Sequence, residues 1–149
     1  MDTRNFKNLY IFKKKILSFI KPRADSIFGV HNPLGIKLLC RLRIGLSHLH
    51  EHKFKHGFLD SLNPICACGQ GIETTAHYFL HCGLFNFTRT TLFNSIRGIN
   101  PDILNRTDIA ITKLLLYGDP NFSMNTNKII LKSSIEFLIN TNCFDCCLF

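Results

Sequence analysis

The stretch of residues 66–82 constrains this chain more than any other part of its sequence. It reads Cys66-Ala-Cys68-Gly-Gln-Gly-Ile-Glu-Thr-Thr-Ala-His77-Tyr-Phe-Leu-His-Cys82, which is a C-x-C-x8-H-x4-C pattern. Zinc prefers four nitrogen or sulfur ligands at short, fixed distances in a tetrahedron. Two cysteines on a Gly-rich turn, followed by a His and a Cys around a short helix, supply such a set. The pattern predicts one zinc ion bound by Cys66, Cys68, His77 and Cys82.

Two alternatives stay open for this stretch. His81 lies one helical turn after His77, so His81 could replace Cys82 as the fourth ligand. Five residues on an α-helix rotate by about 140°, so Cys82 is expected at or beyond the helix end. The cysteines could instead be free thiols that pack as small hydrophobic groups. If four protein ligands do bind, no coordination position is open, which indicates a structural metal and not a catalytic one.

The rest of the chain carries apolar residues at helical spacing, with Pro and Gly between the segments. This pattern predicts a mainly α fold, a small helical domain with a central zinc-knuckle-like loop. Helices are expected at residues 4–20, 34–52, 74–80, 84–97, 108–117 and 126–139. In the last helix the inward residues are expected to be Ile129, Ile130, Ile135 and Leu138. Three parts should form one compact unit: a basic helical segment 1–56, the loop 57–83 and a C-terminal helical segment 84–149.

The net charge of +8 is unevenly distributed. Through His56 there are twelve Lys and Arg against three Asp and Glu, whereas the remainder has six against seven. Such a segment favours a polyanionic partner, usually nucleic acid, although a solvated basic helix face gives the same count. Phosphate contacts are expected from Lys13, Lys14, Lys15, Lys37, Arg41 and Arg43. Phe54 or Tyr78 could stack on a base, but aromatic residues at these spacings more often belong to a core.

Other patterns narrow the class of protein. No secretory signal and no apolar run long enough to cross a bilayer is present, so we expect an intracellular protein, nuclear or cytoplasmic, without a membrane partner. Clustered cysteines in that setting bind metal more often than they form disulfides. Phosphate-binding Gly-rich loops and the G-x-S-x-G and H-E-x-x-H motifs are absent, so we expect no enzymatic activity. We interpret His48, His52 and His56 as part of a polar, basic helix end. Cys143, Cys146 and Cys147 are interpreted as thiols without an assigned role.

Four stretches of the sequence carry a resemblance to a known family. They are His31-Asn-Pro-Leu-Gly-Ile-Lys-Leu-Leu-Cys-Arg-Leu-Arg-Ile-Gly-Leu-Ser-His-Leu, Glu51-His-Lys-Phe-Lys-His, Cys66 to Cys82 with Glu73-Thr74, and Leu114-Leu-Leu-Tyr-Gly118. The combination of R-L-R-x-G-x-S-H-L with C-x-C…E-x-x-x-H-x-x-x-x-C is specific. With it, the chain resembles the C-terminal tail of the reverse transcriptase polyprotein of non-LTR (LINE-type) retrotransposons.

In that family the tail follows the polymerase domain and carries a Cys-Cys-His-Cys zinc knuckle that helps to hold template RNA or target DNA. The resemblance implies Zn2+ on Cys66, Cys68, His77 and Cys82, with RNA or DNA and a reverse transcriptase core as partners. The paired aspartates of the polymerase palm and the endonuclease are missing, so the chain resembles a detached fragment of a transposable element. The alternatives are a protein-interaction module that packed on the polymerase, and a relic without function.

Overall fold

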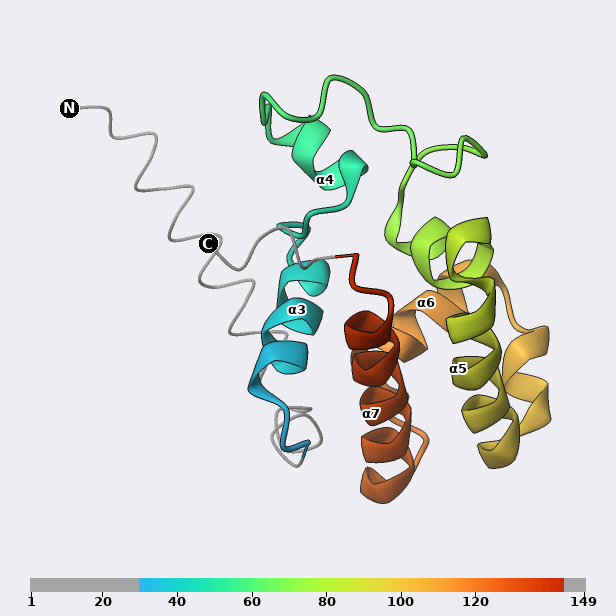
Figure 1. Ribbon diagram of the computed structural model, residues 1–149. Helices are drawn as coiled ribbons and strands as arrows, with labels where there is room; N and C mark the ends of the chain where they lie inside the picture. The colour runs from blue at the N-terminus through green and yellow to red at the C-terminus, as the bar shows by residue number, and fades with distance from the viewer. Residues whose placement is uncertain (1–29, 144–149) are drawn as a thin grey trace.

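The computed structural model describes residues 30–143, which are mainly α-helical, as the periodicity predicts. With the labels of Figure 1, the helices are α3 (Pro33–Arg43), α4 (His50–Lys55), α5 (Asn86–Ile99), α6 (Asp108–Tyr117) and α7 (Met124–Asn140). Shorter elements are a π-helical turn at His77–His81 and 3₁₀ turns at Gly83–Phe85 and Pro101–Asn105. The predicted helix 4–20, with Lys13, Lys14 and Lys15, lies outside the described residues, as do Cys146 and Cys147.

Helix α7 lies at the centre of the bundle, where it packs against α5, α3 and α6 (Figure 1). Its buried stripe includes Ile130, Ser134 and Leu138. Ile129 was predicted to face inward but is 51% exposed, because at about 100° per residue it falls to the side of that stripe. None of the helices between residues 30 and 143 combines the length and the hydropathy that a membrane crossing requires.

Three helices begin at a residue whose side-chain oxygen accepts a hydrogen bond from the backbone N–H three positions later. These residues are Asn32 for α3, Thr107 for α6 and Ser123 for α7. Each such cap satisfies a backbone donor that the helix leaves open and contributes about 1 kcal/mol. The cap at Ser123 explains why α7 begins two residues before the start that periodicity predicts.

The single helix predicted over residues 34–52 is wrong, because the chain breaks between α3 and α4. The Leu46 N–H donates to the Arg41 carbonyl and the Gly45 N–H donates to the Leu42 carbonyl, at 2.9 and 3.2 Å. This Schellman motif needs a residue in the left-handed region, and Gly45 has φ of 70°. The chain then continues through α4 into a loop that crosses above the bundle to the start of α5 (Figure 1).

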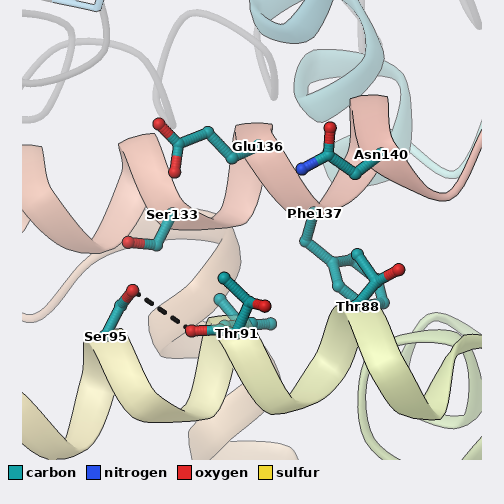
Figure 2. Close-up of a pocket in the computed structure, with 8 residues that line it drawn as sticks. Thr88, Thr91, Ser95, Ser133, Glu136, Phe137 and Asn140 are labelled. Atoms are coloured by element: carbon teal, nitrogen blue, oxygen red, sulfur yellow. Dashed lines mark hydrogen bonds between the residues drawn. The ribbon is translucent and has the colours of Figure 1, made fainter.

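A shallow groove lies between α5 and α7. Five of its eight lining residues carry a hydroxyl or amide group, and Figure 2 shows Phe137 pointing from α7 toward α5. The Ser95 hydroxyl donates to the Thr91 carbonyl at 3.2 Å, so part of this polar lining is satisfied within α5 itself. Glu136 is the single titratable residue in the lining. The groove is therefore a packing interface between two helices and has no pair of titratable groups for acid–base catalysis.

Candidate metal centre

The four predicted ligands come together in the folded chain. One ligand atom from each of Cys66, Cys68, His77 and Cys82 lies within 4.8 Å of every other. The Cys66 and Cys82 sulfurs are 3.6 Å apart, and the Cys68 sulfur lies 3.2 Å from Nε2 of His77. A tetrahedron with metal–sulfur bonds of about 2.3 Å has sulfur–sulfur edges of about 3.8 Å. The cluster therefore fits one four-coordinate metal ion.

Cys66 and Cys68 lie on a tight turn that the backbone closes by itself. The Cys66 N–H donates to the Gly71 carbonyl at 2.8 Å, and the Gly69 N–H donates to the Cys66 carbonyl at 2.9 Å. Gly69 and Gly71 have φ of 73° and 152°, values that other residues rarely adopt. The Gln70 N–H points at the Cys68 sulfur, 3.4 Å away. The glycines of this Gly-rich turn are therefore required by its backbone conformation.

His77 and Cys82 bracket a helical turn with one extra residue. Thr74 Oγ1 accepts a hydrogen bond from the His77 N–H at 2.9 Å, which caps the turn. The Cys82 N–H donates to the His77 carbonyl at 2.7 Å, a bond that spans five residues and defines a π-turn. Such turns occur frequently at functional sites. Cys82 is the first residue after this turn, beyond the helical end as the sequence predicts.

This helical turn is anchored in the core by the two residues after His77. Tyr78 and Phe79 are both fully buried. The Phe79 ring stacks on the Phe137 ring of α7 at a centroid distance of 5.3 Å, and Tyr78 meets both rings edge-on. The Tyr78 hydroxyl lies 2.5 Å from Thr141 Oγ1. Tyr78 is thus a core residue, which is the more common of the two interpretations that the sequence leaves open.

His81 lies outside the cluster. Its Nε2 atom is 2.5 Å from a carboxylate oxygen of Asp108 at the start of α6, and its side chain is 52% exposed. The extra residue of the π-turn therefore presents Cys82 to the other ligands and directs His81 toward α6. In the folded chain Cys82, and not His81, lies together with Cys66, Cys68 and His77.

The pKa values of the four ligands follow their surroundings. Burial raises the pKa of the Cys66 and Cys82 thiols, whereas the backbone N–H of Gln70 lowers that of Cys68. Burial lowers the pKa of His77 and so favours the neutral imidazole that metals bind. Two buried thiols resist ionisation unless a cation is present, which is how metal sites couple deprotonation to binding.

Glu73 connects the turn to α4. The carboxylate is buried and accepts a hydrogen bond from the His50 N–H at 2.6 Å, while its other oxygen lies 3.4 Å from the Cys66 sulfur. The His50 ring also contacts the Ile65 carbonyl at 2.5 Å. A carboxylate beside a ligand is a common supporting contact in metal sites. The sequence marks Glu73 only through its place in the resemblance.

Arg89 on α5 is, like Glu73, a residue beside the cluster that no ligand-spacing pattern in the sequence marks. It is 6% exposed, and its guanidinium donates to the Cys82 carbonyl at 2.5 Å. The helical periodicity indicates that Arg89 is buried, because position 89 falls on the same helical face as Leu92 and Ile96. An arginine on an apolar stripe has to find partners inside the protein.

The predicted nucleic-acid-binding residues of α3 have different surroundings. Lys37 is exposed. Arg41 is half-buried and its guanidinium lies 3.1 Å from His48 Nε2. Arg43 donates to the Leu116 carbonyl at 2.6 Å and lies over the Tyr117 ring, 5.1 Å from its centroid. Arg43 therefore joins α3 to α6, and Lys37 is the most accessible of the three.

Comparisons with protein-family models, with curated proteins and with solved structures find no match to this chain.

Proposed function

We propose that this chain is a zinc-stabilised module that binds RNA or DNA without catalysis, as the tail of a non-LTR retrotransposon reverse transcriptase. The observation that carries the proposal is the closed set of Cys66, Cys68, His77 and Cys82. Three sulfurs and one imidazole nitrogen suit zinc and disfavour oxygen-seeking cations such as Mg2+. Because no ligand position is left for a substrate, the metal acts by fastening the loop to the helical bundle.

The nucleic-acid part of the proposal is supported by charge. The excess of Lys and Arg is confined to the segment that ends at His56, and Lys37 presents its ammonium to solvent on α3. Contacts between such groups and phosphates give an affinity that depends on salt and little on sequence. The Lys13–Lys15 run supplies the densest positive charge in the segment.

Two measurements on the full chain test the two parts separately. Metal analysis of protein purified under reducing conditions should find about one zinc per chain, and a value near zero rejects the metal part. Filter binding to single-stranded RNA should weaken steeply between about 50 and 200 mM salt. Replacing Lys13, Lys14 and Lys15 with Ala should reduce binding, whereas Lys128→Ala with Lys132→Ala, on the exposed side of α7, should not. Absence of binding at low salt, or binding indifferent to salt, rejects the nucleic-acid part.

A protein-interaction module is the second candidate, and exposed apolar side chains favour it. Leu59, Leu62, Phe87 and Ile109 are between 80 and 94% exposed, and large apolar surfaces often mark protein contacts. Co-expression with a reverse transcriptase core should then raise the soluble yield and give a stable complex on gel filtration. An unchanged yield with separate elution rejects this candidate.

A further inference from the structure

Arg89 is the single Lys or Arg among residues 30–143 that is buried. All three nitrogens of its guanidinium donate hydrogen bonds. Nε donates to the Phe79 carbonyl at 2.8 Å, Nη2 to the Cys82 carbonyl at 2.5 Å and Nη1 to Asn86 Oδ1 at 2.7 Å. Two of these acceptors belong to the segment that carries the metal ligands His77 and Cys82.

These partners supply dipoles but no negative charge. No carboxylate of residues 30–143 lies within ion-pair distance of Arg89, whereas Arg106 on the surface pairs with Asp119 at 2.9 Å. Burying a cation without a counter-ion carries a large desolvation cost. The carbonyl contacts offset part of that cost, and the remainder calls for a nearby anion.

A loaded metal centre provides that anion. One Zn2+ with three thiolates and a neutral imidazole carries a single net negative charge. Arg89 is within electrostatic range of the centre, because its guanidinium bonds the backbone carbonyl of the ligand residue Cys82 at 2.5 Å and that of Phe79, two residues after His77, at 2.8 Å. The buried cation and the anionic loaded centre would therefore lie side by side, joined through the Cys82 carbonyl.

We propose that Arg89 is the counter-ion of the metal-loaded centre and a positioning residue for Cys82. This role rests on the proposed zinc site and belongs to a residue that binds no metal itself. In the metal-free protein Arg89 only satisfies carbonyls at the end of the π-turn. In the loaded protein the charge of Arg89 also offsets the charge of the centre, so removal of that charge weakens metal binding more than it weakens the fold.

The test compares three variants of the full chain. Arg89→Gln removes the charge and keeps an N–H donor, and Arg89→Lys keeps the charge. Arg97→Gln is the matched control, because Arg97 lies on the same helix, bonds Asn94 three residues earlier at 3.0 Å and is exposed. Zinc affinity is measured by competition with a chelating dye. We expect Arg89→Gln to weaken binding by about 10- to 100-fold, Arg89→Lys to recover most of that loss, and Arg97→Gln to match the wild type.

Two further readouts separate this role from a purely structural one. The Co2+ absorption spectrum should keep its thiolate bands in Arg89→Gln, since the ligand set is unchanged, and the metal-free melting temperatures of Arg89→Gln and Arg89→Lys should agree. If Arg89→Gln binds zinc as tightly as the wild type, or Arg89→Lys binds as weakly as Arg89→Gln, the counter-ion role is wrong. Arg89→Met replaces Arg89→Gln if the latter does not fold. A wild-type chain without zinc would instead reject the proposed function.

Discussion

The two halves of the metal centre are held in opposite ways. Cys66 and Cys68 belong to a loop whose apolar residues face solvent, with Leu59 94% and Leu62 87% exposed. His77 and Cys82 flank a turn whose next two residues, Tyr78 and Phe79, are fully buried. Hydrophobic packing therefore forms the second half before any metal binds, whereas the first half has backbone hydrogen bonds and few buried contacts. A metal ion bound by the four residues would fasten the loop to the bundle.

Removal of zinc should give the largest effect and the most direct test of this comparison. Structural zinc contributes about 10–16 kcal/mol in small zinc-binding peptides. A chelator should therefore abolish hydrogen-exchange protection of the Cys66 and Gly69 amides while the buried amides of α7 keep theirs. Zinc, but not Mg2+, should restore the loop. Equal loss of protection in the loop and in α7 would contradict the division into two halves.

Replacement of a metal ligand should have the second-largest effect. Cys82→Ser should lower bound zinc from about one per chain to near zero, because it removes one of four ligands. His81→Asn should leave the stoichiometry unchanged, since His81 contacts Asp108 and lies outside the cluster. Metal analysis after gel filtration checks both. The reverse pattern, with zinc lost only in His81→Asn, would return His81 to the site.

Core truncation should have a smaller effect that is confined to the buried half. Phe79→Ala should cost about 3–5 kcal/mol of unfolding free energy, because the Phe79 ring is fully buried against Phe137. Leu59→Ala should change stability by less than about 0.5 kcal/mol. Urea titration of the metal-free chains checks both values. Similar losses at the two positions would mean that the loop carries a core of its own.

The smallest effect should be a dependence of stability on pH that comes from His52 in α4. Burial lowers the pKa of His52 below its ordinary value of 6.5, and its Nδ1 lies 2.7 Å from Ser47 Oγ. In the unfolded chain the imidazole gains a proton as pH falls below 6.5, while the folded chain resists it. Stability should therefore be complete above pH 6.5 and fall toward pH 5.

His52→Asn, which keeps an acceptor or donor near Ser47, should flatten this slope. Melting temperatures of metal-free wild type and variant, measured from pH 7 to pH 5, check the prediction. Parallel slopes for the two chains would assign the pH dependence to other groups.

Sequence predicts the ligands better than it predicts the supports around them. Spacing predicts Cys66, Cys68 and His77 and leaves Cys82 and His81 as alternatives for the fourth ligand, because donor type and chain reach limit the choices. It predicts neither the break at Gly45, where a left-handed residue ends α3, nor the burial of Arg89. The break comes from a local Gly cap inside an apolar pattern of helical spacing. Position 89 lies on the apolar face of α5, but the carbonyl partners that allow an arginine to be buried there come only from the fold. The groups that hold the ligands in place come from α4 and α5, which only the fold brings to the site.

The π-turn between His77 and Cys82 has a consequence for chain length. A π-turn is an α-helical turn with one residue inserted, so the four residues between these ligands are fixed in number by the helix itself. Deleting one would restore an ordinary turn and carry Cys82 to another side of the helix. The stretch between Cys68 and His77 is held by a glycine turn and not by a helix, so no helical repeat fixes the number of its residues. Related sequences should therefore vary in length before His77 and keep the H-x4-C interval constant.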